Sequence, residues 1–207
     1  MKIHPSQIEG VEIGPATDLP PLATEFGVMI TNRTDQTIAF VGVRFDLIRP
    51  DGRPAASVQY GDMLRFPEMA DFVPGGTRFV SIEHGVTESV RQGLRVEDHL
   101  GYRRILTNLQ GLRRMIGISV SLDCIAFADG RFFGPDLGEA FTRLCSEREA
   151  ELQFRSRILA MKSITLASLQ AAPKRFENLS TLLMRAGEEA VGEAIESHRL
   201  RIPLQIG

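Results

Sequence analysis

The chain has 207 residues, of which 43% are hydrophobic and 24% are charged, a composition typical of folded globular domains rather than of disordered chains. A chain of this length buries roughly 70% of the surface that its unfolded form exposes, so it needs no disulfide or metal to fold. Its 24 basic and 26 acidic residues give a net charge of −2, which excludes a global attraction to nucleic acid or to an anionic membrane surface.

The N-terminal stretch, MKIHPSQIEG, lacks the apolar run of a signal peptide. No stretch approaches the roughly 18 uninterrupted apolar residues of a membrane-spanning helix, so none is predicted. We therefore expect the chain as given to be soluble, and the sequence leaves its compartment unassigned.

From residue 6 to about residue 133 the hydrophobic pattern has period two, as in half-buried β-strands. Alternating apolar residues predict strands near residues 26–30, 39–47, 79–82 and 116–126. The stretches TNRTDQT, RPDGRP and VPGGT separate the apolar runs and predict turns. Short strands with turn signals at fairly regular spacing favour an antiparallel β-sandwich over a parallel sheet.

The longest strand signal is MIGISVSLDCIAF. Its alternation predicts one buried face, which contains Ile116, Ile118, Val120, Leu122, Cys124 and Ala126. Asp123 falls on the opposite face. Towards the end of the stretch Ile125 and Phe127 make that second face apolar too, so another element is expected to cover this end of the sheet.

The run EFGVMITNRTDQTIAFVGVRFDLIRPDG, followed later by PGGTRFVSIE, resembles the immunoglobulin-like or fibronectin type III-like β-sandwich domains that are common in bacterial proteins of unassigned function. The resemblance covers roughly residues 6–133. It implies an antiparallel Ig/FN3-like sandwich and brings no functional residues with it. The chain contains no tryptophan, so the buried tryptophan of antibody domains is absent.

Past Asp136 the hydrophobic period changes to that of a helix. One narrow stripe contains Phe141, Cys145, Leu152, Leu159 and Leu166, with Arg148, Arg155 and Lys162 at its edge. A second apolar set on nearly the opposite side contains Phe154, Ile158 and Met161. A helix with two apolar faces usually packs against two surfaces, so we predict that the second set lines a binding surface.

Pro173 breaks this helical run, and the stretch RFENLSTLLMRAGEEAVGEAIESH predicts a second helix. We interpret residues 136–198 as an αα-hairpin. The predicted fold class is mainly β plus α, with a β-sandwich domain over residues 1–135 followed by a C-terminal helical hairpin with its tail over residues 136–207.

The stretch FADGRFFGPDLGEA connects the two parts. Asp129-Gly130 predicts a tight hairpin turn, and Asp136 with Glu139 resembles a helix-capping pair. The alternative is a cation site that uses Asp123, Asp129 and Asp136. The stretch has neither the alternating oxygen ligands nor the final glutamate of an EF-hand loop, so we predict a structural joint without metal or cofactor.

Other reactive residues carry no recognisable pattern. Cys124 and Cys145 fit no zinc-site spacing and are expected to be buried and inert, and whether they pair is left open. The histidines, His4, His84, His99 and His198, lack ligand spacing. No catalytic residue is nominated from spacing. The Asn32-Arg33-Thr34 sequon matters only in a host that glycosylates.

The segment TESVRQGLRVEDHLGYRRILTNLQGLRR is rich in arginine. It contains Arg91, Arg95, Arg103, Arg104, Arg113 and Arg114. An arginine cluster beside Tyr102 can bind phosphate groups or an acidic partner. The alternative is a solvated connection whose arginines pair with acids elsewhere, and the near-neutral chain favours that interpretation.

These observations favour a non-enzymatic interaction or structural module. Its C-terminal helices would pack on the sandwich, on a second copy or on another protein, and no nucleic acid is expected as a partner. One alternative is an enzyme whose site is assembled from dispersed groups such as His84, Asp98 and His99. Another is a polyanion-binding protein that uses the Arg-rich segment 88–114.

Overall fold

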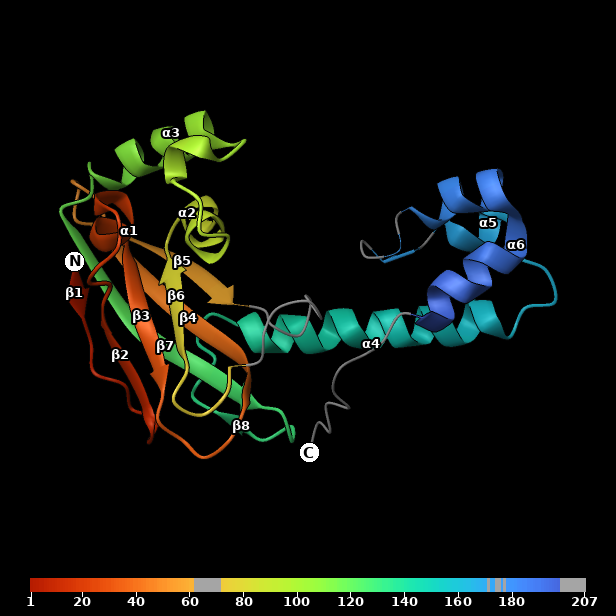
Figure 1. Ribbon diagram of the computed structural model, residues 1–207, viewed down its shortest axis with the longest axis horizontal. Helices are drawn as coiled ribbons and strands as arrows, with labels where there is room; N and C mark the ends of the chain where they lie inside the picture. The colour runs from red at the N-terminus through yellow and green to blue at the C-terminus, as the bar shows by residue number, and fades with distance from the viewer. Residues whose placement is uncertain (62–71, 171, 174–175, 177, 198–207) are drawn as a thin grey trace. The chain divides into compact units, whose positions relative to one another are not determined.

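The structure is a computed structural model that describes residues 1–61, 72–170, 172–173, 176 and 178–197 (Figure 1). It divides into two compact units, an N-terminal unit over Met1–Ala140 and a C-terminal unit that begins at Phe141. The tail from residue 198 to residue 207, which includes the last of the four histidines, lies outside the described residues.

The N-terminal unit contains two β-sheets. The larger sheet has the order β1-β7-β4-β5, with β8 also paired to β7, and its strands are Lys2–Ile3 (β1), Gly117–Phe127 (β7), Ile38–Ile48 (β4), Pro54–Gly61 (β5) and Phe132–Phe133 (β8). The smaller sheet has the order β2-β3-β6, with strands Val11–Pro15 (β2), Gly27–Asn32 (β3) and Thr77–Ser81 (β6). All pairs are antiparallel except β1 with β7, which is parallel.

One hydrophobic core contains residues from both sheets. Val28 and Ile30 of β3 and Val43 and Phe45 of β4 are fully buried in it. Burial of each such side chain contributes about 1.5–3 kcal/mol to folding. The strands predicted near residues 26–30 and 39–47 are therefore present, and Val41, Val43, Phe45 and Leu47 reach the shared core as the alternation predicted. The alternation fails at the start of β4, where the register shifts between Ile38 and Phe40: Ile38 rather than Ala39 reaches the shared core, and Phe40 is also buried.

β7 contains a β-bulge that the sequence pattern did not show. Leu122 lies opposite Val43 of β4, whereas Cys124 lies opposite Gly42. Asp123 is therefore an additional residue between two paired positions. An additional residue inverts the alternation of a strand from that point onward.

The bulge corrects the predicted buried face of β7. Up to the bulge the face towards the shared core contains Ile118, Val120 and Leu122, and beyond it this face contains Ile125 and Phe127. The prediction that Cys124 and Ala126 continue the first set is wrong. Both are buried, but they lie on the other side of the strand. Ile116 precedes the strand and is exposed.

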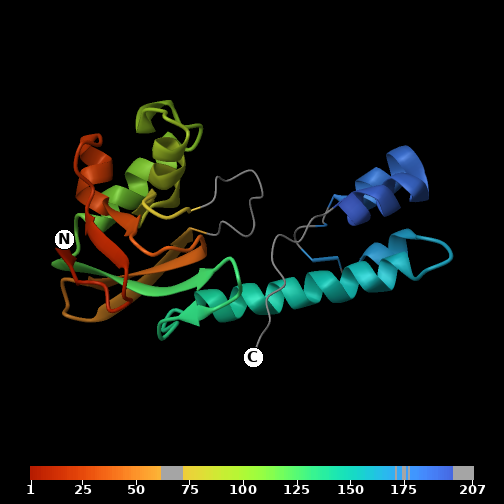
Figure 2. The same ribbon diagram turned by 60° about the horizontal axis from the view of Figure 1, so that its bottom comes forward.

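Helices occupy more of the N-terminal unit than predicted. They are α1 (Pro21–Phe26), α2 (His84–Arg91), the short 3-10 helix η1 (Val96–Asp98) and α3 (Tyr102–Leu112). Figures 1 and 2 show α1, α2 and α3 gathered on the same side of this unit. The interpretation of residues 88–114 as a solvated connection is therefore wrong, because Val96, Ile105 and Leu109 are buried in the shared core.

The C-terminal unit is helical. It contains α4 (Ala140–Leu159), which begins at the boundary between the units, α5 (Leu166–Leu169) and α6 (Leu179–Ser197). Its own core contains Phe154, Ile158, Leu169, Phe176, Leu179, Val191 and Ile195. α4 ends at Leu159, so the predicted stripe does not continue to Leu166 within one helix. α6 is kinked at Gly187, which has φ 85° and ψ −177°.

The fold is therefore mixed α/β. Over the described elements, residues in helices outnumber residues in strands, so the expectation of a mainly β protein is corrected. The helices that were not predicted are α1, α2, η1 and α3.

Candidate functional site

The joint after β8 is held by the side chain of Asp123. This carboxylate is buried, and its two oxygens accept hydrogen bonds from the backbone N–H groups of Leu137 (3.0 Å) and Gly138 (2.9 Å). Gly134 has φ +109°, and a Cβ atom placed on it would lie 2.3 Å from the carbonyl oxygen of Asp123. The chain can pass this close to the bulge only because residue 134 is glycine.

The hairpin turn in this stretch is confirmed and the helix cap is not. The N–H of Phe127 donates to the carbonyl of Arg131 (2.9 Å), and Gly130 adopts φ 92° between them. Asp136 and Glu139 both have positive φ, and α4 begins only after them. The predicted capping pair is therefore wrong, because both residues belong to a turn that precedes the helix.

Two of the three predicted cation ligands meet, together with a thiol. Ligand atoms of Asp123, Cys124 and Asp136 lie within 4.8 Å of one another, and the Cys124 thiol donates to Asp136 Oδ1 at 3.5 Å. Asp129 instead forms an ion pair with Arg131 at 2.8 Å. Because both oxygens of Asp123 already accept backbone N–H groups, the cluster is explained as a structural joint.

The environment of Cys124 disfavours its thiolate. Burial raises the pKa of this thiol above its usual range, and the nearby carboxylates of Asp136 and Asp123 raise it further. A thiol that stays protonated is a poor nucleophile and a poor metal ligand. Cys124 and Cys145 do not form a disulfide bond with each other.

We expect Cys124 to resist alkylation in the folded protein. Iodoacetamide at mildly alkaline pH should modify Cys124 at least roughly 100-fold more slowly than in the denatured chain, because its thiol is buried and protonated. Cys145, which is partly exposed, serves as the internal control. The two rates are measured by mass spectrometry of the cysteine-containing peptides. Equal rates for Cys124 in the folded and denatured protein would contradict this assignment.

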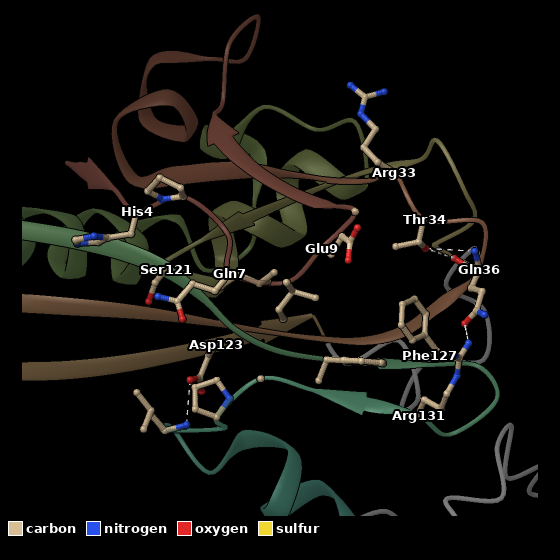
Figure 3. A pocket seen from close by; sticks show the side chains of 18 of the residues that line it. His4, Gln7, Glu9, Arg33, Thr34, Gln36, Ser121, Asp123, Phe127 and Arg131 are labelled. Atoms are coloured by element: carbon tan, nitrogen blue, oxygen red, sulfur yellow. Dashed lines mark hydrogen bonds between the residues drawn. The ribbon is translucent and has the colours of Figure 1, made fainter.

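A groove of about 1160 Å³ opens beside the joint (Figure 3). Its labelled polar residues are His4, Gln7, Glu9, Arg33, Thr34, Gln36, Ser121, Asp123 and Arg131, which come from the N-terminal segment, the β3–β4 turn, β7 and the loop before β8. Arg131 donates to Gln36 and to Asp129, and Arg33 pairs with Glu12 at 3.1 Å. Its two arginines are therefore engaged with neighbouring side chains.

Asn32 organises the turn at one side of this groove. Its side chain is fully buried. The amide nitrogen donates to the carbonyls of Gln36 (2.7 Å) and Phe72 (2.9 Å), and the amide oxygen accepts from the N–H (3.0 Å) and hydroxyl (2.6 Å) of Thr34. The Asn-Arg-Thr triplet is thus a structural element of the folded chain. The nitrogen that a glycan would use is enclosed.

Within the described part of the chain, only some arginines of the predicted cluster are free of ion pairs and so available to bind an anionic ligand. Arg91 pairs with Glu88, and this hydrogen bond is the main cause of the lowered pKa of the Glu88 carboxyl. Arg95 pairs with Glu97 at 3.6 Å. Arg103 and Arg104 lie exposed on α3. Among the described residues, neither has a carboxylate within ion-pair distance.

The polar residues proposed for a dispersed enzyme site do not line either hollow described in the N-terminal unit. His84 and Asp98 are exposed, and His99 uses Nδ1 to accept the N–H of Gly101 at 2.9 Å. The second hollow, of about 440 Å³, includes Glu83, which accepts a hydrogen bond from Asn108 at 2.9 Å.

Only part of the apolar binding surface predicted on α4 is exposed. Phe154 and Ile158 are buried in the core of the C-terminal unit, where the ring of Phe154 stacks on that of Phe176 with centroids 5.4 Å apart. Their partner face is therefore provided by this chain. Met161 follows α4 and is exposed. Leu152 and Leu159 on α4 are also exposed, at 45% and 40%.

No protein-family model, curated protein or solved structure matches this chain. Within the described residues, no helix has the length and apolar character needed to cross a membrane.

Proposed function

We propose that the chain is a non-enzymatic interaction module whose C-terminal unit presents a surface to a protein partner. The observation that carries this proposal is the exposure of Leu152 and Leu159 on α4, at 45% and 40%. Residues separated by seven positions project from nearly the same side of a helix, so the two leucines form one stripe.

The remaining apolar set of α4 strengthens the argument. Phe154 and Ile158 already have partners in the C-terminal core, so the exposed leucines are not needed to hold α4 in its own unit. A single exposed leucine is ordinary on a protein surface. Two on one helical stripe, followed by the exposed Met161 and Leu166, are more typical of a surface that binds another molecule.

We also propose a more detailed fold for each of the two units. An Ig/FN3-like sandwich in the N-terminal unit is supported by the sheets' common core and by their mostly antiparallel pairing. The parallel β1–β7 pair and the helices α2 and α3 are additions to that pattern. A helical hairpin in the C-terminal unit is supported by the core that α4 and α6 share.

An enzymatic function has less support. Candidate groups for catalysis should converge on one pocket with perturbed titration. His84, Asp98 and His99 line neither described hollow, and the thiol with a strongly raised pKa, Cys124, is engaged with Asp136.

The proposal is tested with the double variant Leu152→Glu/Leu159→Glu. Charges on the stripe should reduce recovery of a bound protein at least tenfold in affinity capture, because apolar contact area is replaced by carboxylates that resist desolvation. The stability of the chain should change by less than about 0.5 kcal/mol, as is usual for exposed positions. Sedimentation velocity shows whether the partner is a second copy.

The matched control is Ala150→Glu/Gln153→Glu, which adds the same charge to exposed positions on the other side of α4. It should retain the partner. Recovery of the same proteins by both double variants, with both folded by circular dichroism, would show that the stripe is not an interaction surface.

A further inference from the structure

α3 presents a cationic face to the outside of the N-terminal unit. Ile105 and Leu109 turn inward to the shared core. The exposed positions include Arg103 and Arg104 on the helix and Arg114 just after it. No carboxylate occurs in the sequence from His99 to Leu122. Figure 1 shows α3 at the outer margin of this unit.

Large aliphatic side chains flank this cationic helix at both ends. Leu100, two residues before α3, has a relative exposure of 107%, so its side chain is free of contact with the protein. Ile116, after α3, is 67% exposed, and its N–H donates to the carbonyl of Ile48 (2.9 Å), which is itself 45% exposed. Both ends of the helix therefore combine arginine with uncovered hydrocarbon.

We propose that this face of the N-terminal unit, defined by Leu100, Arg103, Arg104, Arg114 and Ile116, docks on the surface of an anionic lipid bilayer. The guanidinium groups would bind lipid phosphates, and the two aliphatic side chains would enter the interfacial layer. The inference is independent of the proposed protein-binding stripe on α4.

The aliphatic residues favour a bilayer over a nucleic acid. A nucleic acid rewards arginine with phosphate contacts but offers no hydrocarbon phase to Leu100 or Ile116. Binding of single strands instead relies on exposed aromatic rings. The nearest tyrosine, Tyr102, is only partly exposed and packs on the shared core.

The neighbouring charges determine how strong the attraction can be. Arg91, Arg95 and Arg113 are paired with Glu88, Glu97 and Glu25 respectively. Asp98 lies two residues before Leu100 in the sequence. Arg103, Arg104 and Arg114 therefore supply the attraction, each worth roughly a fivefold increase in binding near an anionic surface. The net charge of −2 opposes it weakly, because salt screens charges beyond about 8 Å.

The experiment measures co-sedimentation of the full chain with phosphatidylcholine vesicles that contain or lack phosphatidylserine. Binding to the anionic vesicles should be at least about tenfold stronger than to the neutral vesicles and should weaken with added salt. Arg103→Ala/Arg104→Ala should reduce it roughly 25-fold, the product of two fivefold effects. Leu100→Ser, which leaves every charge in place, should reduce it roughly tenfold.

Arg53→Ala is the matched control, because this exposed arginine lies in the β4–β5 turn and pairs with Asp51 at 3.7 Å. It should leave vesicle binding unchanged. No preference for anionic vesicles, an equal loss in the Arg53 variant, or full binding by Leu100→Ser would each overturn the inference. So would tighter binding to a single-stranded oligonucleotide than to the vesicles. The Leu152→Glu/Leu159→Glu variant should bind vesicles normally, which separates this inference from the proposed function.

Discussion

Replacing Asn32 with alanine is expected to lower the free energy of unfolding by about 3 kcal/mol, because the change removes hydrogen bonds and leaves their buried partners unsatisfied. Asn32 is fully buried, and its one side chain bonds donors and acceptors of three residues, Thr34, Gln36 and Phe72, on two segments of the chain. Each partner left without a hydrogen bond costs about 1–3 kcal/mol where water cannot replace it. The loss of stability is therefore expected to be several times larger than that caused by an average surface substitution.

The chemistry of this position makes Asn32→Asp informative. The variant keeps an oxygen for Thr34 but replaces the amide donor with a second oxygen, which would face the carbonyls of Gln36 and Phe72. We expect it to be at least as destabilising as Asn32→Ala at neutral pH, because a buried charge then faces two acceptors. A purely steric role for Asn32 would predict instead that aspartate, which has the same shape, restores stability.

Urea unfolding followed by circular dichroism measures both variants. The control is Asn108→Ala, which removes one exposed hydrogen bond to Glu83 and should cost less than about 1 kcal/mol. Similar losses for Asn32→Ala and Asn108→Ala would show that the buried network does not stabilise the β3–β4 turn.

The second large effect is expected at the β7 bulge, where Asp123→Ala should lower the free energy of unfolding by about 3 kcal/mol. Two hydrogen bonds from backbone N–H groups to a carboxylate are lost, and bonds to charged groups contribute about 1.5–3 kcal/mol each. The amides of Leu137 and Gly138 would then lose their carboxylate acceptor beside a buried strand. Their hydrogen exchange should accelerate together with the loss of global stability.

Asp129→Ala is the control for this prediction, because it removes an exposed aspartate of the same stretch, with its Arg131 ion pair, and should cost less than about 1 kcal/mol. The comparison also tests the cation-site alternative. If Asp123 anchors the loop through N–H groups alone, the stability difference should be the same with calcium, with zinc and with a chelator. A metal-dependent gain in the parent protein that Asp123→Ala abolishes would contradict the structural interpretation.

The sequence predicts the structure best where a regular hydrophobic pattern faces a single hydrophobic core. β3, and β4 from Val41 onward, alternate regularly over one core, so period two identifies the residues that face it. The Asp129-Gly130 turn follows from local backbone preferences, because glycine adopts positive φ at little cost. The helical period after Asp136 likewise predicted α4, although not its ends.

The candidate site was less accessible to sequence analysis. The sequence places Asp123 and Asp136 in one stretch, but the hydrogen-bond partners of Asp123 are backbone N–H groups fourteen and fifteen residues away, which no side-chain pattern predicts. Asn32 was visible as a glycosylation triplet, whereas its role depends on the carbonyl of Phe72, forty residues away. The exposure of Leu100 could not be predicted either, since a leucine in a sequence is ordinarily expected to be buried, and only the fold decides that this one is exposed.

The amino-acid sequence by itself therefore determined the strands of regular alternation, the turn at Asp129-Gly130 and the change to helical structure near the boundary of the two units. These depend on interactions within a few residues. Tertiary structure decided the bulge at Asp123, the helices between β6 and β7, and which apolar set of α4 is covered. The reason is physical: a one-residue insertion in a strand and the burial of a helix face depend on the partner that packs against them, and that partner lies far away in the chain.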